Sequence, residues 1–333
     1  NEKYGSLYWL LDQTKTAMGS RLLKQWIERP LISQDKIEKR LDIVEIFTNN
    51  FIQRESIKEI LKDIYDLERL SSRIAFGNIN ARDLKWISNS LKVIPELKGQ
   101  LLSINEPLLD ELANRLVDLN YICELVDKAI IDNPPLTVKD GGIIKDGFNE
   151  ELDELRYIRD HGKQWLASFE QKEREKTGIK GLKIGYNRVF GYYIEVTKAN
   201  LPLIKDEFNY TRKQSLANAE RFVTPELKDM ESKLLSAQDK MIKLEYVLFT
   251  QIRDYIKNDV HVLQDVAKIV AMVDVYQSMA VLSSENSYVR PVFNQEKTLK
   301  IVDGRHGIIE KVMSQRTYVS NDIDIDKENP VLL

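Results

Sequence analysis

The sequence predicts a mainly α-helical protein with a multi-helix core and two long antiparallel helices that carry a small antiparallel β module at their tip. The start of an α/β domain is expected at the C-terminal end. Three observations predict this arrangement: apolar residues recur every three or four positions over most of the chain, apolar and polar residues alternate between 182 and 196, and helical spacing returns after 224.

Amphipathic segments account for the first 132 residues. One spans 6–29 and stops at Pro30, and a second spans 33–50. Three more helices are expected, at 51–75, at 80–94 with an end near Pro95, and at 108–132. Their short connections favour a bundle or stacked array, and no repeat of about 20–50 residues indicates a solenoid.

A linker rich in proline and glycine, 133–147, precedes the first long helix. Asn149 is expected to cap that helix, which fades at Thr177–Gly178. Two strands are expected around a hairpin loop and two more beyond it: 182–186, 192–196, 208–213 and 219–223.

The second long helix is predicted to start at Thr224-Pro225-Glu226, which supplies an N-cap, a first-turn proline and an acidic residue. Its apolar stripe continues to Tyr255, over about 30 residues or about 45 Å. A further helix covers about 260–282. The chain thus runs out along one helix, through a sheet and back along another, which suits gripping better than enclosing a pocket.

The last segment, 286–333, becomes strand-like at 288–293 and 299–302. It ends at Asn329–Leu333 without closing a domain, and the chain starts without Met, so we expect a piece of a longer protein. We find no signal peptide and no run of about 18 apolar residues, and therefore expect no membrane partner.

Positive charge is concentrated in the β module. Residues 165–224 contain seven lysines and four arginines against seven acidic residues, so their net charge is +4 and the rest of this −3 chain is −7. A basic tip on an acidic body suits a polyanionic partner, although a solvated, salt-bridged surface would have the same composition. Four aromatic residues of the module lie between 186 and 193: Tyr186, Phe190, Tyr192 and Tyr193. They could stack on bases or, as is more common for alternating aromatic residues, pack the sheet.

Residues that would support catalysis or metal binding are few. The three histidines lack metal-ligand spacing, and the lone Cys123 is expected to be buried. The run from Asp322 resembles a calcium loop but has Lys327 in place of Gly and Leu333 in place of Glu. No Gly-x-x-x-x-Gly-Lys-Ser/Thr phosphate loop occurs. We therefore expect no catalytic residue, metal or cofactor in this chain.

Several stretches resemble the MutS mismatch-repair family: LYWLLDQTKTAMGSR at 7–21, KIGYNRVFGYYIEVTK at 183–198, RKQSLANAERFVTPEL at 212–227, GRH at 304–306 and YVSND at 318–322. The resemblance implies four parts: helical core and first lever helix at 1–164, a clamp over duplex DNA at 165–224, the returning lever helix and core at 225–285, and the beginning of an ATPase domain at 286–333. It also implies a full-length ATPase that binds ATP and Mg, forms a homodimer and meets mismatch-repair partner proteins in the bacterial cytoplasm, at the nucleoid.

Clamp positions of the family are matched by five residues suited to DNA: Arg188, Arg212, Lys213, Asn218 and Arg221. Tyr318 matches an aromatic position near adenine in the family. Gly307 follows His306 where the family commonly has Pro. Two alternatives to a DNA clamp and lever remain: a helical scaffold for protein interactions, and a MutS-like paralogue acting on recombination intermediates.

Overall fold

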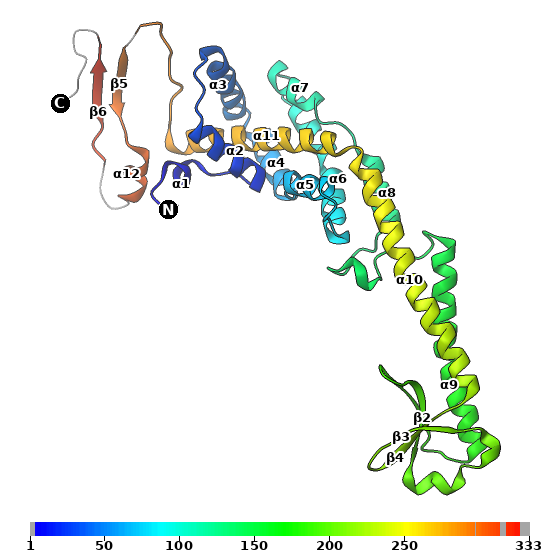
Figure 1. Cartoon of the computed structure of the whole chain (residues 1–333). Helices are drawn as coiled ribbons and strands as arrows, with labels where there is room; N and C mark the ends of the chain where they lie inside the picture. Colours follow the sequence, from blue (N-terminus) through cyan, green and yellow to red (C-terminus); the bar gives the residue numbers. More distant parts are fainter. Residues whose placement is uncertain (1–3, 297, 314–317, 327–333) are drawn as a thin grey trace. The chain divides into compact units, whose positions relative to one another are not determined.

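The computed structural model describes residues 4–296, 298–313 and 318–326 (Figure 1). The chain divides into two compact units: the first unit contains 1–79, 83–126 and 253–333, and the second unit contains 80–82 and 127–252. Helices dominate the described residues, which confirms the prediction of a mainly α protein. The chain start without Met, the end at Asn329–Leu333 and the calcium-loop positions Lys327 and Leu333 lie outside the described residues.

The first unit is built around a long apolar helix, α11 (Val260–Asn286), which packs against α2, α3, α4 and α5. The other elements that lie wholly or mostly in this unit are α1 Leu7–Leu11, α2 Ala17–Glu28, α3 Gln34–Asn49, α4 Phe51–Lys62, α5 Leu67–Ala75, α6 Ala81–Ser103, α7 Pro107–Asn114, α8 Asn120–Ala129, β5 Leu299–Gly304, α12 Gly307–Val312 and β6 Asn321–Ile325. β5 and β6 pair as an antiparallel two-stranded sheet.

Helix α11 is apolar enough to pass a simple test for a membrane span. Its most apolar 18-residue stretch has a mean hydropathy of 1.4. Polar residues interrupt this stretch, so a criterion based on consecutive apolar residues does not detect it. However, 78% of that stretch is buried inside the protein, as expected for the central helix of a core.

A buried carboxylate on α11 fixes the N-terminal motif at 7–21. Asp274 accepts hydrogen bonds from the backbone N–H groups of Lys15 (2.9 Å) and Thr16 (2.7 Å) and from the Thr16 hydroxyl (2.7 Å). A Cβ on Gly19 would lie 2.3 Å from Asp274 Oδ2, so this close approach requires glycine. Burial raises the pKa of Asp274, although these hydrogen bonds act in the opposite direction.

The expected helix end near Pro95 is wrong, because α6 continues through this proline to Ser103. Proline inside a helix removes one backbone hydrogen bond and costs about 3 kcal/mol. Leu91, Ile94 and Leu97 are buried around it, and their packing offsets that cost. Tertiary burial therefore overrides the local stop signal.

Other predicted boundaries are wrong because N-caps lie inside the apolar patterns. Thr16 caps α2 and Asp66 caps α5, so the segments 6–29 and 51–75 each contain two helices. The predicted helix 108–132 is likewise divided into α7 and α8. The region 288–293 is not a strand; its Arg290 instead forms ion pairs with three carboxylates of α3: Glu38, Asp42 and Glu45.

The second unit contains the two long helices and the predicted sheet. The elements that lie wholly or mostly in it are α9 Glu150–Thr177, β1 Lys183–Asn187, β2 Gly191–Thr197, β3 Thr211–Ser215, β4 Ala219–Val223 and α10 Pro225–Lys257. Asn149 and Thr224 accept hydrogen bonds from Leu152 N and Leu227 N, as expected of N-caps. The third strand begins later than predicted, since 206–208 form a 3₁₀ turn.

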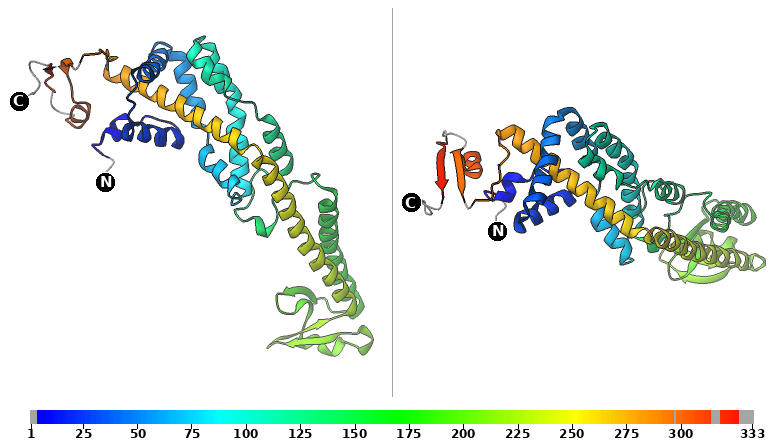
Figure 2. Two further views of the ribbon diagram at one scale, coloured as in Figure 1. Left: turned by 45° about the horizontal axis from the view of Figure 1, so that its top comes forward. Right: turned by 90° about the horizontal axis from the view of Figure 1, so that it is seen from above.

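Helices α9 and α10 lie side by side and antiparallel within the second unit (Figures 1 and 2). Gly162 of α9 packs against Leu234 of α10, because a Cβ on Gly162 would lie 2.0 Å from Leu234 Cδ2. Arg156 and Glu245, further along the pair, are joined at 2.9 Å. Residues later in α9 thus meet residues earlier in α10, which confirms the antiparallel arrangement predicted from the order of the elements.

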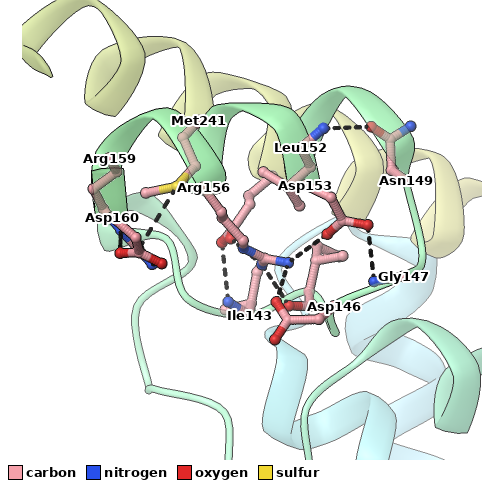
Figure 3. A network of polar contacts seen from close by, with 12 residues as sticks. Ile143, Asp146, Gly147, Asn149, Leu152, Asp153, Arg156, Arg159, Asp160 and Met241 are labelled. Atoms are coloured by element: carbon pink, nitrogen blue, oxygen red, sulfur yellow. Dashed lines mark hydrogen bonds and ion pairs between the residues drawn. The ribbon is translucent and has the colours of Figure 1, made fainter. Parts of the chain in front are cut away.

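A polar network ties the linker to both long helices (Figure 3). Arg156 of α9 donates to Asp146 (2.7 Å), to the Ile144 carbonyl (2.7 Å) and to Glu245 of α10 (2.9 Å). The other Glu245 oxygen accepts from Ile143 N at 3.0 Å, and the Glu245 side chain is only 1% exposed. One arginine therefore satisfies a buried carboxylate and holds the linker in place.

The sheet is antiparallel with strand order β1-β2-β4-β3. One face is apolar and packs on α9 and the start of α10, forming a small core: Phe169, Ile179, Leu182, Ile194, Val196, Phe222 and Leu227. The alternation detected between 182 and 196 is therefore the signature of a sheet with one buried face. This packing gives the module a hydrophobic core of its own.

Candidate nucleic-acid interface

The face of the sheet opposite its core has a polar row that crosses all four strands. Lys183, Glu195, Arg221 and Gln214 are neighbours in register on β1, β2, β4 and β3. Arg221 donates to Glu195 Oε2 (3.0 Å) and to Gln214 Oε1 (2.9 Å). Its side chain is only 18% exposed, so Arg221 fastens the strands together and has little free surface for phosphate.

Tyr193 completes this arrangement. The Arg221 guanidinium carbon lies 4.1 Å from the centre of the Tyr193 ring, and the same tyrosine packs on Gly185. A Cβ at Gly185 would be 2.6 Å from the tyrosine ring, so a glycine is needed there. Tyr193 is thus engaged in packing, as is Tyr192, which lies against the core and 5.0 Å from Tyr186.

The β1–β2 hairpin presents Arg188 at an exposed tip. Asn187 Oδ1 accepts from Val189 N at 2.8 Å, which shapes the turn, and Gly191 has a φ of +78°. Glu231 of α10 lies directly beneath and accepts from Tyr192 N at 3.3 Å. The tip is therefore held at its base, and Arg188 has no ion-pair partner among the described residues.

Strand β3 forms an edge of the sheet and carries Arg212 and Lys213. A register shift between Arg212 and Gln214 makes Lys213 the extra residue of a bulge. Arg212 Nε lies 2.7 Å from Glu220 Oε2, a charge contact without hydrogen-bond geometry, and the arginine side chain is 61% exposed. Lys213 is exposed and has no acidic partner within the described ranges.

Asn218 lies in the turn between β3 and β4, at the opposite end of the sheet from Arg188. Its carbonyl accepts from Lys198 N at 3.0 Å, and its side chain is exposed. The five predicted residues therefore do not form one cluster. They are distributed over one hairpin tip, one turn, one edge strand and one polar face.

Ion pairing separates the module's cations into two classes. Six have a carboxylate within 4 Å: Lys172, Arg174, Lys176, Lys205, Arg212 and Arg221. In the described part of the chain, five exposed cations have none: Lys180, Lys183, Arg188, Lys198 and Lys213. The site residues proposed from the sequence omit Lys180, Lys183 and Lys198. Lys183 could have been identified from the sequence, because its alternation with Ile184 places it on the polar face of the predicted strand.

A partly buried hydrogen bond fixes the chain just before β3. The Tyr210 hydroxyl donates to Glu173 Oε2 of α9 at 2.6 Å, and Lys176 lies 3.5 Å from the other Glu173 oxygen. Burial, followed by the bond to Glu173, raises the pKa of Tyr210 well above its ordinary value. The edge strand with Arg212 and Lys213 is thereby anchored to α9.

Tyr318 belongs to the first unit, where it precedes β6 and is partly exposed. In the same unit, His306 caps α12 by accepting from Ile309 N. A Cβ on the next residue, Gly307, would lie 2.6 Å from the Tyr288 hydroxyl and 2.9 Å from Leu10 Cδ2. Local crowding thus gives a physical reason for glycine at 307. Within the described residues, no group of three or more His, Cys, Asp or Glu side chains is placed to hold a metal ion.

Comparison with known proteins gives a consistent picture. The family model described as MutS domain III matches residues 1–280. The protein named DNA mismatch repair protein MutS from Bacillus cytotoxicus is 51% identical over 332 residues, which cover 100% of this chain and 37% of that protein. Proteins of the same name from Oceanobacillus iheyensis and Geobacillus thermodenitrificans are 50% and 51% identical, over 99% of this chain and 38% and 36% of their own lengths. The chain therefore spans little more than a third of these relatives.

Proposed function

The chain belongs to the MutS family, and on that premise we propose that it is the lever and clamp of a mismatch-repair protein. In this proposal, residues 165–224 grip duplex DNA without reading its sequence, and the helical parts at 1–164 and 225–285 couple that grip to an ATPase domain that begins at 286–333. Long helices joined by a buried network suit such coupling, which needs an element that both sites bias.

The observation that carries the proposal is the excess of unpaired cations on the β module. Five exposed lysine and arginine side chains lack a carboxylate partner in the described residues, while the rest of the chain is net negative. Flexible cations of this kind neutralise phosphates and give salt-sensitive binding.

The whole protein is proposed to be a homodimeric ATPase that depends on ATP and Mg, with Tyr318 near adenine. It is proposed to act with repair partner proteins at the nucleoid.

A pair of matched double variants tests the clamp. Arg188→Ala with Lys213→Ala removes two unpaired cations, whereas Lys172→Ala with Lys205→Ala removes two ion-paired cations from the same module. Binding to a labelled random-sequence duplex is measured by fluorescence anisotropy between about 50 and 200 mM salt. We expect weak binding by the parent chain, with the slope of log K against log salt reduced by up to about 2 in the first variant and less in the second.

Equal losses in both variants would show that only net charge matters and would refute the site. An affinity no greater than that of an unrelated acidic protein would favour the helical interaction scaffold. Preference for a four-way junction over duplex of equal length would favour a paralogue acting on recombination intermediates.

A further inference from the structure

The first unit contains a cavity of about 250 Å³ between the N-terminal half of α3, the helix α7 and the middle of α11. Its floor is apolar and includes Ile43, Leu108 and Met272. Its lining also carries four cations and a single carboxylate: Lys36, Lys39, Arg40, Arg115 and Glu111. This cationic lining contrasts with the net charge of −7 outside the β module.

Two of these cations are neutralised by neighbours. Lys39 Nζ lies 2.7 Å from Glu111 Oε2, and Arg115 Nη2 lies 2.9 Å from Asp265 Oδ1. Lys36 and Arg40 have no carboxylate partner among the described residues. The cavity therefore keeps two positive charges that no acidic side chain in that part of the chain balances.

Arg40 is held in a fixed position by aromatic side chains. Its guanidinium carbon lies 3.4 Å from the centre of the Trp26 ring, and the buried Tyr276 also lines the cavity. Trp26 and Tyr276 in turn pack edge to face at 5.4 Å. Burial lowers the pKa of Arg40, an effect larger than the opposing one of Tyr276. A partly desolvated, oriented guanidinium is a good receptor for a planar carboxylate.

We propose that this cavity docks a short acidic segment of a partner protein. A carboxylate of the segment pairs with Arg40 and Lys36, and an adjacent apolar side chain of the segment fills the floor. The inference does not depend on DNA binding by the β module.

The shape of the cavity favours a peptide over duplex DNA. A phosphate backbone offers no apolar group for the floor, and a recess of this volume admits a side chain and not a duplex. An apolar anchor surrounded by charge pairs is instead the common pattern of peptide recognition.

The test uses a fluorescein-labelled, acetylated and amidated peptide of alternating Asp, Glu, Leu and Phe. One control peptide replaces Asp and Glu by Asn and Gln, and a second replaces Leu and Phe by Ala. Each is titrated into the 333-residue chain carrying ¹³C-methyl methionine. Met272 reports the cavity, and Met241, in the second unit, serves as the internal control.

We expect saturable binding of the acidic peptide with a shift of the Met272 methyl signal and none at Met241. Binding should fall tenfold or more for either control peptide and for Lys36→Glu, an exposed position where the substitution leaves the fold intact. Arg40→Gln should have the same effect, whereas Lys62→Glu, on α4 and outside the cavity lining, should match the parent chain.

Three outcomes would overturn the proposal. The Asn/Gln peptide could bind as tightly as the acidic one, which would leave only apolar contact. Lys36→Glu could leave binding unchanged, which would place the peptide elsewhere. Duplex DNA could shift Met272 and displace the peptide, which would make this face a nucleic-acid surface.

Discussion

Replacing Arg156 by Ala should destabilise the base of the long helices far more than a neighbouring arginine substitution. Arg156 forms an ion pair with Glu245, whose side chain is 1% exposed. Without the arginine, that carboxylate keeps the hydrogen bond from Ile143 N at 3.0 Å but no cation contact. Removing one partner of a buried pair costs about 3–5 kcal/mol.

The control is Arg159→Ala on the same helix. Arg159 pairs with Asp160 at 2.9 Å, but both side chains are substantially exposed, so screening by solvent leaves the pair worth little. Hydrogen–deuterium exchange of peptides covering 141–158 reports the local free energy of opening. Since about 1.4 kcal/mol is tenfold, exchange near Ile143 should accelerate by about 10² to 10⁴ in Arg156→Ala and far less in Arg159→Ala.

A double variant identifies the cause of the loss. Arg156→Ala with Glu245→Gln removes the unbalanced charge while keeping an acceptor for Ile143 N, so it should recover part of the protection. If the double variant exchanges as fast as Arg156→Ala, the loss comes from the contacts to Asp146 and the Ile144 carbonyl. The reasoning about a buried charge would then be refuted.

Three further predictions concern individual positions. Burial raises the pKa of Asp274 in the folded protein, so the folded state binds more protons than the unfolded state above about pH 4. The free energy of unfolding of the parent chain, relative to that of Asp274→Asn, should therefore fall as pH rises from about 4. Urea titrations measure this difference, and an increase with pH would contradict the prediction. Pro95→Ala restores a helical N–H at an exposed position of α6 and should raise the free energy of unfolding by about 1–3 kcal/mol, whereas a decrease would show that the proline has a packing role. Gly191→Ala forces an unfavourable φ and places a Cβ 1.6 Å from Glu231 Oε1, so it should cost about 2–3 kcal/mol, and Gly191→Ala in a Glu231→Ala background should cost less; equal costs would exclude the clash.

The elements with strong local patterns were predictable. Asn149 and Thr224 mark the starts of the two long helices, because side-chain caps act on backbone groups only a few residues away. The alternation around Ile194 likewise predicts a sheet with one buried face. Pro95 shows the limit of such reasoning, since its local preference to end a helix is outweighed by burial of residues distant in sequence.

The sequence by itself determined the helical class, the out-and-back order of the long helices and the positive charge of the β module, because periodicity, caps and composition are local properties. Only the tertiary structure decided which cations keep their charge free. Arg188 and Arg221 are equivalent by residue type, yet one is exposed at a hairpin tip and the other is bound to Glu195, Gln214 and Tyr193 across the sheet. The difference depends on strand register and on side chains far apart in the chain, and electrostatic availability follows from those contacts.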